Sequence, residues 1–467
     1  MVQQQQYAND KPVIKLFTSR NKNYVYDVYS NRIFELTKEQ YQELHRLVDC
    51  GISDYTKMSV DSKSYSDILL MLQKGYFRSP WIEEIKHEES EYIPWITKRG
   101  ISFLSLQVTN ECNFKCRYCL YTRENKIDRT HENIKMSWDV AKRSVDFLWR
   151  NSKDSSKINI AFYGGEPLLN FNLIKKVVAY ADEVFELKNI TYNLTTNGSI
   201  LTDYIIDFLA EKNFNIAISL DGPELVQNRH RKFYTNGNDT FHVVWKNVVR
   251  IKNRQPEWYE SNVFFHPVLM HNEDPEEVFA FFSENGVSRG RVILNLASLD
   301  GIDFDNSDAT FLSHADGIIQ SQSNNMSRNA KTRFMREIYE SRLIPVTWHH
   351  SGPCVPSSKK IHVDSRGFIY PCEKLIDSFS NTIGDIDHGI DDDKVNNILN
   401  IGKMTEDTCR SCFAMRFCNI CVQKCYNPET RSIDAFQKTQ QCELVKKRTL
   451  RYLLEFCENS QANISSK

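Results

Sequence analysis

A regular alternation of strand-like and helix-like segments constrains this fold more than any other sequence feature. Strand-like patterns occupy 101–108, 158–163, 190–194, 215–220, 263–269 and 291–296. Helical patterns lie between them at 138–150, 173–185, 203–211, 241–251 and 275–284. Strict βα alternation predicts a parallel sheet whose active site lies at the carboxyl ends of the strands. Six units instead of eight predict an α/β fold of the incomplete, TIM-like (β/α)6 barrel type.

A loop with three cysteines follows the first predicted strand. Cys112, Cys116 and Cys119 have the spacing Cys-x3-Cys-x2-Cys, which supplies three of the four thiolates that close an iron–sulfur cluster. A zinc knuckle would need a fourth His or Cys ligand nearby, and the loop offers none. Three thiolates on a four-iron cube leave one iron open, so this loop predicts a cluster that binds a small molecule.

Short motifs follow the next three strands. A Gly-Gly-Glu-Pro stretch comes after the second strand, and its glycines let a ligand approach the backbone closely. Thr-Asn-Gly ends the third strand and Ser-Leu-Asp-Gly-Pro ends the fourth. The candidate ligand-binding residues of these motifs and of the following turn are Gly164, Gly165, Glu166, Asn197, Ser219 and Arg231.

Together with the cysteine loop, these motifs resemble the radical S-adenosylmethionine (radical SAM) enzymes. The resemblance implies that the open iron chelates the methionine moiety of S-adenosylmethionine and that the turn at Gly164, Gly165 and Glu166 holds its amino group. It implies that Asn197 and Ser219 lie in stretches contacting the ribose and the carboxylate, and that Arg231 pairs with that carboxylate. Tyr118 would pack on the adenine. Taken singly, Asn197, Ser219 and Arg231 fit a turn or surface role about equally well.

Eight further cysteines gather near the carboxyl end of the chain: Cys354, Cys372, Cys409, Cys412, Cys418, Cys421, Cys425 and Cys442. Their order resembles the SPASM extension of radical SAM enzymes that modify ribosomally made peptides and proteins. It departs from the usual pattern where Cys421 comes one residue early and Cys425 adds a thiol. Eight thiolates are the number that two fully ligated four-iron clusters need. A ribbon-type zinc site is the alternative that these spacings also allow.

The resemblance also implies which of these cysteines share a cluster. The outer cluster would take Cys409, Cys412, Cys418 and Cys442. The inner cluster would take Cys354, Cys372 and Cys425, with Cys421 as its fourth ligand. Without Cys421, an open iron could bind a substrate thiolate. Glu373 occupies the place where sulfatase-maturing relatives carry an acidic residue proposed as a base.

The first 95 residues contain almost no cysteine, and this difference in composition sets them apart from the rest of the chain. Strand patterns at 13–17, 23–29 and 31–36 precede a helix capped by Thr37 and a second helix over 65–74, with another strand starting at 76–77. Tyr24, Tyr26 and Val28 alternate with polar residues, as in a half-buried edge strand. The region is winged-helix-like and resembles precursor-recognition domains, which implies a leader peptide added to the edge strand. A structural cap is the alternative.

Composition limits the partners of this chain. The 467 residues carry a net charge of −1, which does not favour nucleic acid or an anionic membrane surface. No apolar stretch is long enough to span a membrane, and residues 1–15 lack the apolar core of a signal peptide. We expect a cytoplasmic protein.

A few residues outside the motifs are predicted to have no functional role. Cys50 and Cys457 are expected to be small buried apolar side chains. No role is assigned to His230, His266 or His271, three histidines of the barrel region.

These features predict three domains: a precursor-recognition domain at 1–95, a radical SAM partial barrel at 96–325, and a bridging region with a SPASM domain at 326–467. The resemblance implies three [4Fe-4S] clusters, reductive cleavage of S-adenosylmethionine, and an electron donor such as flavodoxin or ferredoxin. The predicted function is installation of thioether cross-links in a ribosomal precursor peptide. The alternatives are a carbon–carbon cross-linking maturase, an anaerobic sulfatase-type maturase that forms formylglycine, and a non-catalytic iron–sulfur or zinc scaffold.

Overall fold

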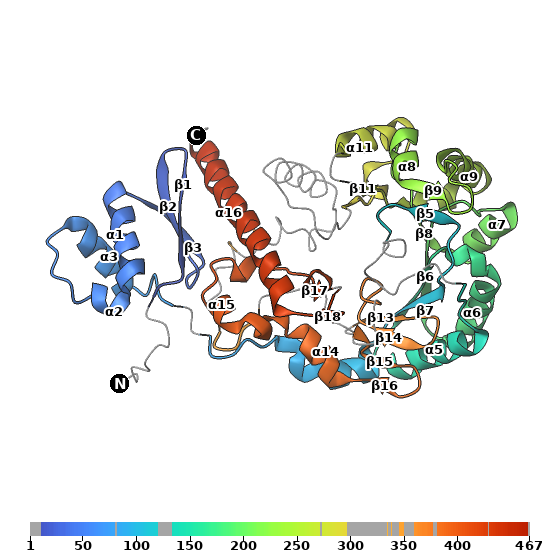
Figure 1. The fold of residues 1–467 in the computed structure, drawn as a ribbon, viewed down its shortest axis with the longest axis horizontal. Coiled ribbons are helices and arrows are strands. Elements are labelled where there is room, and N and C mark those ends of the chain that lie inside the picture. Colours follow the sequence, from blue (N-terminus) through green and yellow to red (C-terminus); the bar gives the residue numbers. More distant parts are fainter. Residues whose placement is uncertain are drawn as a thin grey trace.

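The structure is a computed structural model of the chain. It describes residues 11–79, 82–119, 133–270, 273–296, 334, 338, 345–349, 359–376, 381–427 and 429–465. Cys354 and His271 lie outside the described residues. Figure 1 shows the N-terminal module at one end of the molecule, the large sheet with its helices at the other, and the long helix α16 (Ala435–Ser465) between them.

The N-terminal module is an antiparallel sheet of order β1-β2-β3 followed by helices. Its elements are β1 (Ile14–Ser19), β2 (Lys22–Asp27), β3 (Arg32–Leu36), α1 (Lys38–Cys50), α2 (Ile52–Tyr55) and α3 (Lys63–Gln73). Thr37 begins α1 with a capping box, in which its hydroxyl and backbone exchange hydrogen bonds with Gln40. The first three predicted strands and the two predicted helices are confirmed.

Two sequence-based predictions for this module are wrong. The strand that carries Tyr24 and Tyr26 is β2, which pairs with β1 and β3 and so is the central strand and not an edge. The strand expected at 76–77 is a turn, because Phe77 has a left-handed φ of 57°. The backbone N–H of Phe77 donates to Asp27 Oδ2 at 3.2 Å, so the chain turns back onto the sheet at that point.

The parallel strands of the barrel follow the predicted order. They are β4 (Phe103–Thr109), β6 (Lys157–Gly164), β7 (Asn189–Thr196), β8 (Asn215–Ile218) and β10 (Val263–Phe265). Helices between and after them are α5 (Trp138–Asn151), α6 (Phe171–Val184), α7 (Asp203–Glu211), α8 (Glu224–His230), α9 (Phe241–Arg254), α10 (Pro256–Asn262) and α11 (Pro275–Glu284). The strand predicted at 263–269 is instead two short strands, β10 and β11 (Val268–Leu269), which lie in different sheets. Of the strand predicted at 291–296, β12 (Asn295–Leu296) pairs parallel with β11, and Val292 forms a bridge with Phe265 of β10.

The large sheet extends beyond the predicted barrel through strands from the cysteine-rich region. β13 (Lys360–Val363) adds parallel to the outer edge of β4, and β14 (Phe368–Tyr370), β15 (Gly384–Asp385) and β16 (Gly389–Ile390) follow antiparallel. The resulting sheet has nine strands, in the order β10-β8-β7-β6-β4-β13-β14-β15-β16. Sequence analysis did not predict that residues after 326 join the barrel sheet.

Short elements carry the remaining C-terminal cysteines. They include α14 (Asp392–Leu399), α15 (Glu406–Arg410), the 3-10 turns Met415–Phe417 and Val422–Cys425, and the hairpin of β17 (Tyr426–Asn427) and β18 (Ser432–Ile433). A 3-10 turn (Glu88–Tyr92), α4 (Ile93–Trp95) and a π-helical turn (Ile96–Gly100) lead from the N-terminal module into β4. None of the helices described is long and apolar enough to cross a membrane.

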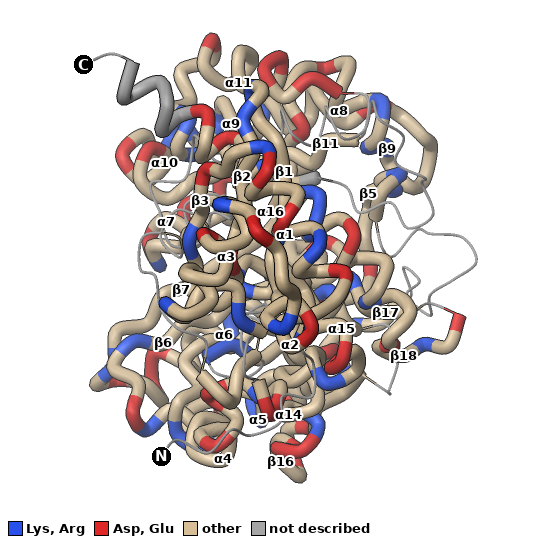
Figure 2. The backbone as a smooth tube through the Cα atoms, turned by 90° about the vertical axis from the view of Figure 1, so that its left-hand side faces the viewer, with Lys and Arg blue, Asp and Glu red and all other residues tan. Residues whose placement is uncertain are grey.

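The N-terminal sheet is buried on both faces. Alternate residues of β2 point to opposite sides, so Val25 packs with Leu44 and Leu47 of α1. Tyr24, Tyr26 and Val28 instead share a core with the C-terminal cysteine region and α16. Figure 2 shows basic and acidic residues interspersed over the face that carries this module, in line with the net charge of −1.

Candidate functional site

The three-cysteine loop lies at the carboxyl end of β4, where a parallel sheet places its chemistry. Within it, β5 (Phe114–Cys116) pairs antiparallel with β9 (Arg231–Phe233), and the register sets Cys116 opposite Arg231. The Arg117 N–H donates to the His230 carbonyl at 2.9 Å, and the Cys119 N–H donates to the Cys116 carbonyl at 3.0 Å. The backbone of the loop is thus fixed against the segment that follows β8.

Nitrogen donors point at the sulfur atoms of this loop. The Phe114 N–H lies 3.4 Å and Asn197 Nδ2 3.9 Å from Cys112 Sγ, and Arg231 Nη1 lies 3.8 Å from Cys116 Sγ. All three cysteines are free of disulfides. Burial raises the pKa of the Cys116 thiol to about 12 against the opposing charge of Arg231. Three adjacent thiols with N–H donors to sulfur are a donor set that fits an iron–sulfur cluster.

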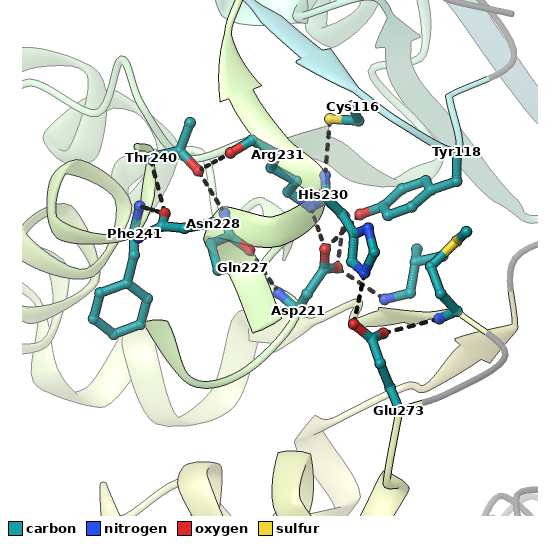
Figure 3. Close-up of polar contacts among 12 residues, drawn as sticks. Cys116, Tyr118, Asp221, Gln227, Asn228, His230, Arg231, Thr240, Phe241 and Glu273 are labelled. Atoms are coloured by element: carbon teal, nitrogen blue, oxygen red, sulfur yellow. Dashed lines mark hydrogen bonds and ion pairs between the residues drawn. The ribbon is translucent and has the colours of Figure 1, made fainter. Parts of the chain in front are cut away.

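A buried network around Asp221 holds the loop in place (Figure 3). The carboxylate accepts hydrogen bonds from Arg231 Nε and Nη2, both at 2.9 Å, and from the Tyr118 hydroxyl at 2.6 Å. It also accepts the Val268 N–H at 2.9 Å. Sequence analysis quoted Asp221 only as part of a motif. Its charge and its place after β8 were the signal that could have identified it as the centre of this network.

Arg231 and Tyr118 therefore have partners that the sequence did not predict. Two guanidinium nitrogens of Arg231 bind Asp221 and the third faces Cys116, so Arg231 joins the loop to the end of β8. The Tyr118 ring lies 5.2 Å from the guanidinium carbon, and burial raises the pKa of its hydroxyl. Contact of Arg231 with a ligand carboxylate and of Tyr118 with adenine stay predictions.

The two glycines after β6 are required by a close backbone contact with the cysteine loop. A Cβ at Gly164 would lie 2.1 Å from the Thr109 carbonyl oxygen, and a Cβ at Gly165 would lie 2.1 Å from that of Glu111. The Gly165 and Glu166 N–H groups donate to the same two carbonyls, at 2.9 and 2.7 Å. In the structure these two N–H groups thus bind the cysteine loop, and contact of this turn with a ligand amino group stays a prediction.

Glu166 connects the turn after β6 with the end of β7. Its carboxylate accepts hydrogen bonds from the Thr196 hydroxyl at 2.8 Å, the Leu168 N–H at 3.1 Å and the Asn197 N–H at 2.7 Å. Burial raises the pKa of Glu166 to about 7, although these hydrogen bonds oppose the shift. Glu166 therefore positions Asn197, whose side-chain amide in turn donates to Asn113 Oδ1 at 2.8 Å.

The structure brings the predicted barrel residues together at one edge of the sheet. Ser219, at the end of β8, is half-buried and its N–H donates to the Thr196 carbonyl at 2.8 Å. Of the unassigned histidines, His230 is buried and shares a 2.6 Å contact with Glu273. His266 lies half-buried between β10 and β11, where burial lowers its pKa.

Glu373 lies beside Cys372 and is paired with a lysine. Lys360 Nζ is 2.7 Å from Glu373 Oε2. Burial opposes ionisation of Glu373, but the charges of Lys360 and His362 outweigh it and lower its pKa to about 2. A carboxylate with so low a pKa is a weak base, which counts against the tentative role of Glu373 as a catalytic base.

Most cysteine thiols of the C-terminal region lie within electrostatic range of one another. Cys412 interacts with Cys409 and Cys442, and Cys418 interacts with Cys409 and Cys412. These are the four residues expected at the outer cluster. Cys425, expected at the inner cluster, interacts with Cys421 of its own set and also with Cys442 and Cys418 of the outer set. Burial raises the pKa of Cys412 to about 11 and of Cys418 and Cys425 to about 12.

Hydrogen bonds to sulfur occur here too. The backbone N–H of Ala414 donates a hydrogen bond to the sulfur of Cys412, and that of Ile420 donates one to the sulfur of Cys418. This donor set therefore fits iron–sulfur ligation as well. Over the described parts of the chain, no three His, Cys, Asp or Glu side chains form a site for a single metal ion.

Residues 106–283 match the Radical SAM superfamily. This segment runs from β4 to α11 and includes the cysteine loop and the motifs after β6, β7 and β8. Together with the enzymes among the similar proteins, the match supports an enzyme.

Several curated proteins are similar to parts of this chain. An uncharacterized protein of Methanocaldococcus jannaschii is 37% identical over 30% of this chain and 44% of its own length. The radical SAM cyclopropyl synthase TigE of Paramaledivibacter caminithermalis is 25% identical over 56% of this chain and 57% of its own. A serine-type anaerobic sulfatase-maturating enzyme of Klebsiella aerogenes is 24% identical over 57% of this chain and 65% of its own length. The chain spans about half the length of the curated relatives it matches.

The fold is also similar to that of a solved structure. Native anSMEcpe with bound AdoMet and the Kp18Cys peptide aligns with a TM-score of 0.57 and 19% identity, over 78% of this chain and 99% of that chain. At this identity the likeness supports the fold alone.

Proposed function

We propose that this protein is a radical SAM peptide maturase that installs thioether cross-links in a ribosomally made precursor peptide. The observation that carries the proposal is the shared core of the N-terminal module and the C-terminal cysteine region. A module of three strands and helices lies directly against candidate auxiliary-cluster ligands. Such an arrangement suits an enzyme that holds one part of a peptide while it modifies another.

The chain's own residues would hold the reactive groups at the carboxyl edge of the sheet. Cys112, Cys116 and Cys119 would ligate the first cluster, with N–H donors from Asn197 and Arg231 to its sulfur ligands. When bound, this cluster and S-adenosylmethionine supply a 5′-deoxyadenosyl radical that abstracts hydrogen from a substrate carbon. Asp221 keeps Arg231 and Tyr118 beside the loop, and Glu166 keeps Asn197 there.

The C-terminal region would form a SPASM domain with two auxiliary clusters. Cys409, Cys412, Cys418 and Cys442 would hold the outer one, and Cys372 and Cys425 would contribute to the inner one together with Cys354. Cys421 is partly exposed, whereas Cys425 is fully buried. An inner cluster that Cys421 leaves open would give a substrate thiolate a place to bind, which supports thioether chemistry.

Mass spectrometry of the product peptide tests this function. The anaerobically reconstituted enzyme is incubated with its precursor peptide, S-adenosylmethionine and a reductant, and then with a thiol-alkylating reagent. Each thioether removes two hydrogens and one alkylatable cysteine thiol, and 5′-deoxyadenosine accumulates. A peptide that keeps its mass and all its thiols contradicts the proposal. The Cys116→Ala variant is the control without the first cluster.

Two related reactions are alternatives that specific relatives favour. Similarity to a cyclopropyl synthase favours carbon–carbon bond formation, in which the mass falls while every cysteine still alkylates. Similarity to sulfatase-maturating enzymes favours formylglycine, which reacts with a hydrazide reagent. A non-catalytic scaffold would release no 5′-deoxyadenosine.

The proposed function also implies partners and a location. A flavodoxin or ferredoxin would deliver the electron, and the protein would work in the cytoplasm on a ribosomal peptide. Nucleic acid and membranes are not among the proposed partners. Reduction of the clusters by purified flavodoxin, followed by their absorbance, tests the electron-donor part of this proposal.

A further inference from the structure

One fully buried lysine lies among the C-terminal cysteines. Lys438 belongs to the first turn of α16 and has no exposed surface. Its Nζ donates to the Thr405 hydroxyl and lies 3.4 Å from Cys409 Sγ. Just before α16, the Asp434 N–H donates to the Cys425 carbonyl at 3.0 Å, so the start of the helix lies against the inner set as well. The charge of Lys438 also acts on Cys418, Cys425 and Cys442. Lys438 is therefore in range of thiols assigned to both auxiliary clusters.

The charge of Lys438 is not balanced by a carboxylate. In the part of the chain that the structure describes, no Asp or Glu forms an ion pair with it. Asp434, one turn earlier, uses its carboxylate to accept hydrogen bonds from Asn427 Nδ2 at 2.7 Å and the Gln437 N–H at 2.8 Å. Burial of an ammonium group without a counter-charge is strongly unfavourable. The surroundings of Lys438 therefore suit thiolates that carry negative charge, which is how cysteines ligate iron.

We infer that Lys438 is a counter-ion shared by the two auxiliary clusters and raises the reduction potential of both. Reduction adds negative charge to a cluster, and a fixed cation beside its sulfur ligands stabilises that added charge. Lys438 reaches Cys409, Cys418 and Cys442 of the outer set and Cys425 of the inner set. The two clusters would thereby become better acceptors for the electron left after the cross-link forms. The inference rests on the auxiliary clusters of the proposed function.

A second lysine near the same cysteines provides a matched control. The charge of Lys446 acts on Cys412 and Cys442. Its Nζ, however, is paired with Glu443 at 2.8 Å and its side chain is 32% exposed. Solvent and the neighbouring carboxylate screen this charge. Removing it should therefore change the cluster potentials less than removing the charge of Lys438.

The test compares Lys438→Met, Lys438→Arg and Lys446→Met in the reconstituted full-length chain. Bound iron is counted, and the potential of each cluster is measured by redox titration with electron paramagnetic resonance. We expect Lys438→Met to make both auxiliary potentials more negative while the first cluster is unchanged. Lys438→Arg should stay near the wild-type value, and Lys446→Met should shift less than Lys438→Met.

Each outcome bears on the shared counter-ion. Unchanged auxiliary potentials in fully loaded Lys438→Met overturn it. Loss of auxiliary iron from Lys438→Met but not from Lys438→Arg supports it, because the charge is then what assembly needs. Loss from both variants overturns it in favour of a packing role. Failure of the auxiliary-cluster assignment is recognised separately: the wild-type chain would then bind about four iron atoms, one cluster's worth, instead of about twelve. Failure of the thioether reaction is recognised from the mass and the alkylatable thiols of the product peptide.

Discussion

Replacement of Asp221 by Asn should destabilise the cysteine loop strongly. The side chains of Asp221 and Arg231 are 0% and 6% exposed. An Asn oxygen can replace only one of the two carboxylate oxygens, so its NH2 group would face a donor of Arg231. The variant loses at least one charge-assisted hydrogen bond, about 1.5–3 kcal/mol, and leaves the guanidinium buried without its counter-charge. Breaking such a buried pair costs about 3–5 kcal/mol in total.

A double-mutant cycle measures this pair against an exposed one. The cycle combines Asp221→Asn with Arg231→Met and follows urea unfolding of the full chain by circular dichroism. The double variant should cost at least about 1 kcal/mol less than the sum of the single variants, because they remove the same interaction. Asp207→Asn is the control, since Asp207 pairs with Arg254 through two oxygens but is 42% exposed. Because solvent screens this exposed pair, Asp207→Asn should destabilise the chain much less than Asp221→Asn. Additive single variants, or equal costs at Asp221 and Asp207, would refute this reasoning.

Three further variants test other parts of the structure. Burial raises the pKa of Glu166 from 4.5 to about 7. The protonated side chain therefore contributes roughly 3 kcal/mol to the free energy of unfolding below about pH 4.5. This contribution is lost as the pH rises through 7. Urea unfolding of the apo-protein against pH should show this fall relative to Glu166→Gln, and parallel pH profiles would contradict it. Gly165→Ala places a Cβ 2.1 Å from the Glu111 carbonyl oxygen, so the first cluster should lose iron. Gly290→Ala is the control, because a Cβ at Gly290 meets no neighbour within 4 Å, and it should keep its iron. Arg416 donates hydrogen bonds to the Val28 and Tyr29 carbonyls at 2.9 and 3.0 Å. Arg416→Met should therefore speed proteolysis between the N-terminal module and the barrel. An unchanged rate would mean that these hydrogen bonds do not hold the module.

The sequence was sufficient to predict the barrel because its signals are local. Five helices and the first four strands of the barrel lie within a few residues of their predicted bounds, because each carries a periodic pattern of apolar residues within its own segment. The cysteine loop and the motifs after β6, β7 and β8 follow strand ends in a parallel sheet. Their convergence at one edge is therefore a consequence of topology.

Contacts between segments far apart in the chain could not be predicted from local sequence patterns. β13 has only four residues, too few for a recognisable period, so its addition to the edge of β4 was missed. Arg231 was assigned to a ligand because its pairing with Asp221 depends on how β9 returns beside the cysteine loop. Phe77 read as strand because an aromatic residue favours β structure, whereas its contact with Asp27 imposes a left-handed turn.

The two-sided burial of the N-terminal sheet decides how this protein can be divided for experiments. A fragment ending near residue 79 would keep Val25 covered by its own helices but would leave Tyr24, Tyr26 and Val28 without the residues that cover them. Such a bare aromatic face favours self-association. Excised recognition fragments would therefore report on an artificial surface, and affinity for a leader peptide is properly measured with the intact chain.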